Sequence, residues 1–138
     1  MFAKMTLCAA ALLFTATTEE TTQPTELELL PIEKNIITYT NAERARHGLP
    51  ALEVDESLMK SARKHGAWMA RSRRLVHTRQ NVAENIAMGQ SSSKEAVNDW
   101  MHSSGHRRNI LNSRYRRIGA AAYRSPGGRI YWCQQFMW

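Results

Sequence analysis

The stretch from Trp100 to Leu111 constrains the fold of this 138-residue chain more than any other part of its sequence. An apolar stripe at helical spacing runs up to Trp100, Gly105 interrupts the helical pattern, and His106 begins a second short helical run. The glycine predicts a break between two helices, and the histidine beside the break brings a side chain that titrates near neutral pH. The residues that meet His106 in space should therefore decide what the chain can do.

Four helices are expected from start signals and apolar periodicity. Pro31 suits the first turn of a helix, Asp55 is a typical N-cap, and Ser92 stands three residues before Glu95, which is the spacing of a capping box. Gly48 is a stop signal for the first helix. The expected helices are residues 31–47, 55 to 71 or 72, 92–103 and 106–111.

Two polar candidates lie between the second and third helices. A loop over residues 73–80 carries His77, and we expect a short helix over residues 81–88 that carries Glu84. We expect two other histidines to have structural roles: His65 should be a packed, hydrogen-bonded side chain, and His102 should be a surface residue.

The end of the chain predicts a β-hairpin. Strands are expected over residues 118–123 and 129–136, joined by a Ser-Pro-Gly-Gly turn at residues 125–128. Cys133 lies in the apolar second strand, so we expect it to be buried, and the alternative is an intermolecular disulfide. Trp100 is expected to anchor the core.

The start of the chain resembles a secretory signal peptide. One lysine, a short apolar run and small residues precede acidic Glu19, and the run is too short to span a bilayer. We expect a signal peptide over residues 1–18, a flexible leader over 19–29 and one domain over 30–138. The mature protein would be secreted or lie in the periplasm or cell envelope, without a transmembrane span.

Charge is distributed unevenly along the chain. Residues 57–138 hold fifteen basic and three acidic side chains, a net charge of +12, whereas residues 1–56 have a net charge of −5. Such a surface favours anionic glycans, envelope polymers or lipid headgroups as partners, although a basic face can also serve solubility alone. Nucleic acid is the least favoured partner because no aromatic residues interleave with the arginines.

Several blocks, in order, resemble the CAP superfamily of SCP-like extracellular domains in its short bacterial form. The blocks are Asn41–Leu52, Asp55–Ala70, His77, Glu84–Ala87, Trp100–Met101, Ser104–Arg107, Asn109–Leu111, Ile118–Gly119 and Tyr131–Phe136. The resemblance implies an α+β fold, a three-layer α-β-α sandwich with a small antiparallel sheet. It also implies a cleft lined by His77, Glu84 and His106. Many members have a second glutamate where this chain has Ser103, and a glycine where it has Ala83.

The three cleft residues allow more than one chemistry. Two imidazoles and a carboxylate could bind zinc or another divalent cation, with His77 and His106 as candidate ligands, and a bound metal would activate water. The same groups could instead form a buried hydrogen-bond network. No activated nucleophile is recognisable: there is no Gly-x-Ser-x-Gly block, and Cys133 has no histidine beside it in sequence.

These observations favour a secreted, non-catalytic binding module whose cleft takes a small ligand, a lipid or a glycan. One alternative is a divalent-metal-dependent hydrolase that uses the same cleft. Another is an arginine-rich structural module that adheres to the cell envelope.

Overall fold

The computed structural model describes residues 27–138. The expected signal peptide and residues 19–26 of the expected leader lie outside the described residues. Within them, the elements in chain order are α1 (Pro31–Arg46), β1 (Glu53–Val54), α2 (Glu56–Ser72), β2 (Ala83–Met88), α3 (Ser93–Met101), α4 (Ser104–Ile110), β3 (Arg117–Arg124) and β4 (Ile130–Met137).

Four of the five expected helices are present, and the start signals of α1, α2 and α3 act as predicted. Pro31 occupies the first turn of α1. The Asp55 carboxylate accepts a hydrogen bond from the backbone N–H of Leu58 at 2.9 Å, and the Ser92 hydroxyl accepts one from the N–H of Glu95 at 3.1 Å. These side chains satisfy N–H groups that have no partner inside the helix. The break expected at Gly105 falls instead at His102 and Ser103, so Gly105 lies in the first turn of α4.

The expected helix over residues 81–88 is wrong, because this segment forms strand β2. It pairs antiparallel with β4, and the register places Glu84 opposite Gln135 and Ile86 opposite Cys133. The alanine, glutamate and methionine in the segment favour a helix locally. Pairing with a strand about fifty residues later in the sequence overrides that preference, since burial and cross-strand contacts decide strand formation.

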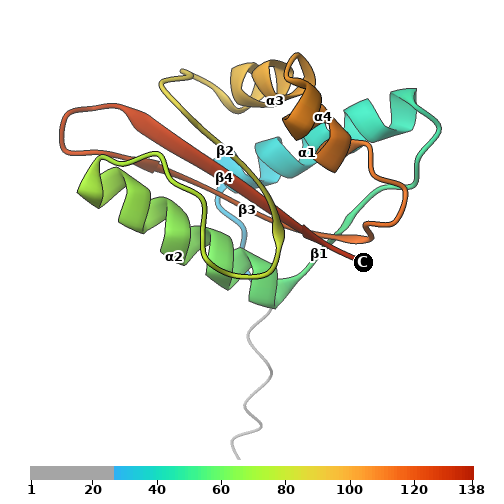
Figure 1. Ribbon diagram of the computed structural model, residues 1–138, viewed down its shortest axis with the longest axis horizontal. Coiled ribbons are helices and arrows are strands. Elements are labelled where there is room, and N and C mark those ends of the chain that lie inside the picture. Colours follow the sequence, from blue (N-terminus) through green and yellow to red (C-terminus); the bar gives the residue numbers. More distant parts are fainter. Residues whose placement is uncertain (1–26) are drawn as a thin grey trace, which may run out of the picture.

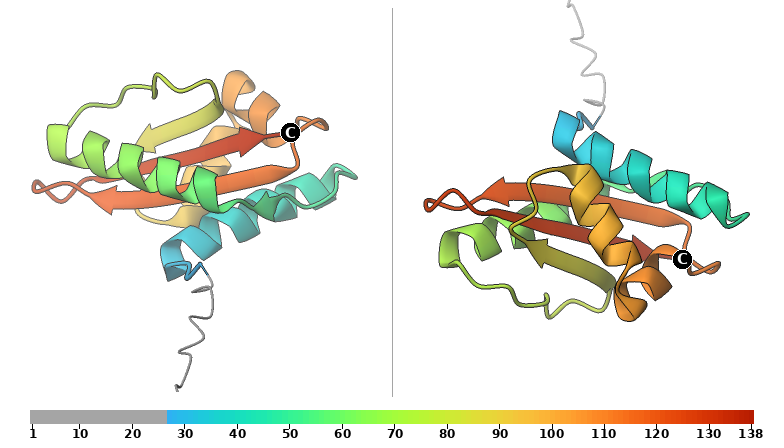
Figure 2. Two further views of the ribbon diagram at one scale, coloured as in Figure 1. Left: turned by 90° about the horizontal axis from the view of Figure 1, so that it is seen from below. Right: turned by 90° about the horizontal axis from the view of Figure 1, so that it is seen from above.

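The sheet has the order β1-β3-β4-β2 and lies between two helical layers. Helix α2 covers one face, and α1, α3 and α4 cover the other (Figures 1 and 2). The fold is therefore the expected α+β three-layer sandwich. The sheet is antiparallel except at its edge, where the two-residue strand β1 runs parallel to β3.

The two faces of the sheet hold separate apolar clusters. Trp100, 1% exposed, lies in the cluster under α1, α3 and α4, and its indole N–H donates to the carbonyl of Ile86 at 3.1 Å. Cys133 is buried in the cluster under α2, as predicted, and is unpaired. Helix α2 lies very close to β3: a Cβ at Gly119 would stand 2.2 Å from the carbonyl carbon of Leu58.

A buried arginine joins α1 to the segments around α4. The guanidinium of Arg44, which is 0% exposed, donates to the carbonyl oxygens of Pro50, Ile110, Asn112 and Tyr115. A single side chain thereby satisfies four backbone acceptors in loops and at a helix end, where regular structure supplies no donors.

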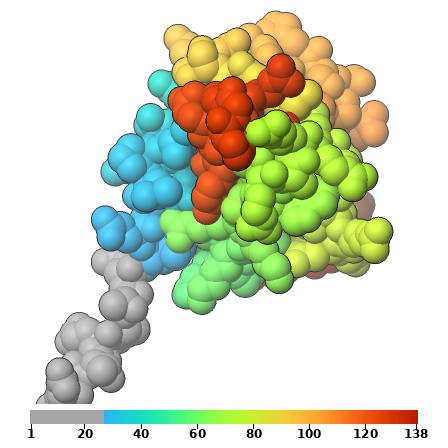
Figure 3. Space-filling model, turned by 90° about the vertical axis from the view of Figure 1, so that its left-hand side faces the viewer, coloured from blue at the N-terminus to red at the C-terminus, as the bar shows by residue number. Residues whose placement is uncertain are grey.

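The turn of the β3–β4 hairpin lies beside the C-terminal end of α2. Figure 3 looks onto this end, where the hairpin (orange to red) stands between α1 (blue) and α2 (green). None of the helices in the described region is long and apolar enough to span a membrane.

Candidate functional site

The centre of the site is the carboxylate of Glu84, whose side chain is 3% exposed. One of its oxygens accepts hydrogen bonds from Nδ1 of His77 at 2.8 Å and from the backbone N–H of Thr78 at 3.0 Å. The other oxygen accepts from Nε2 of Gln135 at 2.9 Å and faces the thiol of Cys133 at 3.7 Å. Both carboxylate oxygens are thus occupied by donors from the protein.

Cys133 is no nucleophile in this environment. Burial, and then the negative charge of Glu84, raise the pKa of the Cys133 thiol well above its ordinary value. The thiol therefore stays protonated, and the thiolate is the form that reacts.

One ring nitrogen of His77 is hydrogen-bonded to Glu84, and the rest of the ring is largely exposed to solvent. Its side chain is 61% exposed, while Nδ1 donates to Glu84. A carboxylate that accepts from Nδ1 keeps the proton there and leaves the Nε2 lone pair free to accept a hydrogen bond. The ring is therefore held in place for a contact with something outside the buried network.

His106 lies in α4, and its side chain makes no hydrogen bond with Glu84. Burial, and then repulsion from the His77 ring when that ring is protonated, lower the pKa of His106, so its ring is neutral at neutral pH. Its carbonyl accepts from Nδ2 of Asn85 at 3.0 Å. Consecutive residues of a strand point to opposite faces, so Asn85 meets α4 while Glu84 faces the α2 side.

The structure therefore brings together only part of the expected trio. His77 and Glu84 share a hydrogen bond, whereas His106 belongs to α4 in the opposite layer, and its side chain is hydrogen-bonded to neither of them. His102 stands apart from the other three: α3 ends at Met101, and Nδ1 of His102 bonds the carbonyl of Asn98 within its own turn.

Sequence reasoning missed Gln135 and undervalued His65. Gln134 and Gln135 are two adjacent polar residues inside an otherwise largely apolar strand, and that irregularity was the available signal. Nε2 of His65 is hydrogen-bonded as expected, to the carbonyl of Val76 at 2.7 Å, but it also stands 3.9 Å from a Glu84 oxygen.

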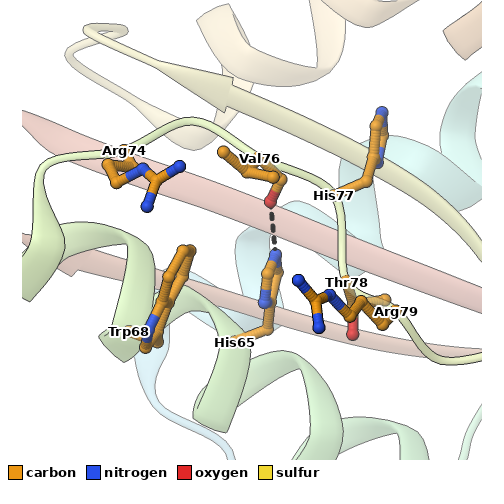
Figure 4. A pocket seen from close by; sticks show the side chains of 7 residues that line it. All are labelled: His65, Trp68, Arg74, Val76, His77, Thr78 and Arg79. Carbon is orange, nitrogen blue, oxygen red and sulfur yellow. Dashed lines mark hydrogen bonds between the residues drawn. The ribbon is translucent and has the colours of Figure 1, made fainter.

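A hollow of about 290 Å³ lies between α2 and the 73–80 loop (Figure 4). His65 and Trp68 form its α2 wall, and the loop forms the other. His77 belongs to this loop, but its ring points away from Trp68. The residues that line the hollow are His65, Trp68, Arg74, Val76, His77, Thr78 and Arg79.

The donor set does not fit a zinc centre with three protein ligands. The Glu84 oxygens already accept three nitrogen donors, which leaves two imidazoles. Within residues 27–138, no three histidine, cysteine, aspartate or glutamate side chains are arranged to hold a metal ion. Catalytic zinc sites use three protein ligands and one water, so we assign no reaction step to a metal here.

The chain resembles several proteins of known sequence or structure. It is 36% identical over 140 residues to the uncharacterized protein YkwD of Bacillus subtilis, with 89% of this chain and 53% of YkwD covered. An extracellular protein with an SCP domain from Bacillus anthracis has a TM-score of 0.68 at 25% identity, with 81% of this chain and 45% of that protein covered. An outer surface protein of Borrelia burgdorferi also has a TM-score of 0.68, at 20% identity, with 75% of this chain and 89% of that protein covered.

The chain spans about half of the length of YkwD, so the activities of whole relatives do not transfer to it. A model of one family matches residues 37–136, which include α2, strands β1 to β3, all but the last residue of β4, and His77, Glu84 and His106. The chain therefore belongs to the CAP family, the cysteine-rich secretory protein family.

Proposed function

We propose that this chain is a secreted, non-catalytic binding module of the CAP family. Its ligand, a small molecule, lipid or glycan, contacts His77 and His106 in a cleft that Glu84 organises from below. Secretion is supported by the signal-peptide pattern of residues 1–18 and by the similar Bacillus anthracis protein, which is described as extracellular.

One observation carries this proposal: Glu84 is buried and its oxygens are saturated. A general base needs a free oxygen within hydrogen-bond reach of the proton that it removes. To act in that way, Glu84 would have to release the Thr78 N–H, His77 or the buried amide of Gln135. The carboxylate is better suited to hold the His77 ring in one orientation and one tautomer.

The two imidazoles are the groups that remain for a ligand. His77 presents Nε2 at the surface, and the neutral ring of His106 can donate from one nitrogen and accept at the other. A metal-dependent hydrolase receives less support, because the metal would have two protein ligands and the carboxylate would be unavailable for proton transfer.

Ligand titrations followed by NMR test the proposal. The histidine ring signals of the labelled protein would be recorded with oleate, a neutral oligosaccharide, an acidic oligosaccharide and Zn²⁺, each added separately. We expect at least one probe to shift the His77 and His106 signals together, and a His102→Asn variant to respond like the wild type. Ester or peptide hydrolysis that disappears in Glu84→Gln, or unchanged His77 and His106 signals with all four probes, would contradict the proposal.

A further inference from the structure

A second hollow lies beside the first along α2. The second hollow, of about 150 Å³, is lined by Ser61, Lys64, His65, Trp68, Thr78 and Gln80. It shares His65, Trp68 and Thr78 with the first, so the two hollows adjoin each other on the surface between α2 and the 73–80 loop. We call this surface the Trp68 groove.

An exposed aromatic platform forms the floor of the groove. The Trp68 side chain is 36% exposed, and its ring stacks on His65 with centroids 5.8 Å apart and planes inclined by 13°. His65 is in turn tied to the carbonyl of Val76 at 2.7 Å. The indole is therefore held in place before any ligand arrives, and a preorganised contact surface lowers the entropic cost of binding.

Positively charged side chains line the walls of the groove, and the buried carboxylate of Glu84 lies behind Thr78 and His65. Arg74 and Arg79 line the first hollow and Lys64 the second, and no acidic residue from the described part of the chain lines either one. The six ion pairs within residues 27–138 involve neither arginine. In Figure 4 the Arg74 side chain reaches towards Trp68, and Arg79 lies beside His65. Guanidinium groups bind carboxylates in a planar, bidentate manner.

The combination of a flat aromatic face, two free arginines and polar Thr78 selects among anionic ligands. An acyl chain needs a continuous apolar surface, whereas the groove offers mainly Trp68 and Val76. The first hollow, at about 290 Å³, is at the small end of ligand pockets, which are roughly 300–1,000 Å³, and the second hollow adjoins it along α2. An extended chain of charged sugar units fits this shape and chemistry.

We propose that the Trp68 groove binds an acidic oligosaccharide, with one sugar ring on the indole of Trp68 and the carboxylates of different sugar units paired with Arg74 and Arg79. This inference rests on the proposed binding function and gives it a ligand class. It places the ligand on the α2 side of the 73–80 loop, the loop that also carries His77.

Calorimetry with a matched pair of ligands tests the inference. The probes are hexagalacturonate, which carries one carboxylate on each sugar, and its methyl ester, which has the same length and no charge on its sugars. We expect the acid to bind and the ester to give no measurable heat. Because charge-assisted hydrogen bonds and aromatic contacts each contribute, Trp68→Ala and the double variant Arg74→Gln/Arg79→Gln should each weaken binding about tenfold or more.

Two further variants serve as controls. Arg114→Gln removes an exposed arginine of the 111–116 segment and should leave the affinity within about twofold, since distant surface charges are screened by salt. Trp68→Phe retains an aromatic face on His65 and should lose less affinity than Trp68→Ala. Circular dichroism melts would show that every variant is folded.

Five outcomes would overturn the inference. Two concern the ligands alone: no measurable heat with hexagalacturonate, or equal binding of acid and ester. The other three are wild-type affinity in Trp68→Ala, an Arg114→Gln loss as large as that of the double variant, and equally tight, Trp68-dependent binding of inorganic polyphosphate. The NMR titrations separate this failure from that of the proposed function. If oleate shifts the His77 and His106 signals while hexagalacturonate gives no heat, the inference fails and the binding function stands.

Discussion

Replacing Glu84 with alanine deprives three nitrogen donors of one acceptor group. They are Nδ1 of His77, the backbone N–H of Thr78 and Nε2 of Gln135. The donors differ in their access to water, so they should contribute unequally. The His77 side chain is 61% exposed and can be rehydrated, whereas Gln135 is 0% exposed and cannot.

The expected cost follows from these differences. A buried donor left without a partner costs ~1–3 kcal/mol, and we take about 2 kcal/mol for Gln135. The half-buried Thr78 N–H and the packing lost with the glutamate side chain add about 1 kcal/mol. Glu84→Ala should therefore lower the free energy of unfolding by about 3 kcal/mol, a large part of the ~5–15 kcal/mol that holds a typical domain together.

Glu84→Gln should cost about 1 kcal/mol, because its carbonyl can still accept from His77 and Thr78 while the charge is lost. Its new amide nitrogen would face Nε2 of Gln135. Rotation of the Gln135 amide relieves this contact, because Oε1 of Gln135 is buried without a partner among the described residues. His77→Ala, which removes only an exposed donor, should cost less than either change at Glu84.

Urea unfolding at pH 7, followed by tryptophan fluorescence, measures all three variants. The expected loss in the free energy of unfolding is largest for Glu84→Ala, smaller for Glu84→Gln and smallest for His77→Ala. A Glu84→Ala variant within about 0.5 kcal/mol of the wild type would show that the buried network contributes little. Equal losses for Glu84→Ala and Glu84→Gln would show that charge, and not the geometry of the acceptors, holds the site.

Three further predictions concern the rest of the fold. Gly119→Ala forces a Cβ against the backbone of Leu58 and should lower the free energy of unfolding by ~1–3 kcal/mol or more. Gly105→Ala, whose Cβ meets nothing within 4 Å, should instead raise it by up to ~1 kcal/mol. Urea midpoints that move in the same direction for both variants would contradict this prediction. Burial and nearby His77 lower the pKa of His106 in the folded protein, so on acidification the unfolded chain takes up this proton first and stability falls as the pH drops below about 6.5. The melting temperature measured between pH 7.5 and 5 should therefore depend less on pH in His106→Asn than in the wild type, and an unchanged slope would refute this assignment. Trp100→Ala should cost ~3–5 kcal/mol in urea unfolding, and a loss below about 1 kcal/mol would mean that the indole is not the core anchor that its burial indicates.

Local signals in the sequence were sufficient to predict the helices. Pro31, Asp55 and Ser92 act on backbone groups within four residues, so their effect does not depend on the rest of the fold. Strand β2 could not be identified in this way, because its hydrogen bonds go to β4 and its local sequence favours a helix.

The residues of the candidate site that belong to family motifs could be predicted from the sequence. The family blocks pointed to His77, Glu84 and His106, and the structure joins His77 to Glu84. Gln135 reaches Glu84 only through the register of β2 on β4, and His65 approaches it only because α2 crosses that face of the sheet. The same packing creates the Trp68 groove, which no sequence motif predicted.

Arg44 stabilises this domain in a way that does not depend on redox conditions, although the family is named for cysteine-rich proteins. In the described part of the chain the loops around α4 are tethered by a guanidinium, and the cysteine there, Cys133, is unpaired. An arginine keeps its proton at any physiological pH and has no bond that a thiol reductant can cleave. The domain should consequently melt at the same temperature with or without dithiothreitol, and it should fold equally well in a reducing cytosol and in an oxidising extracellular medium.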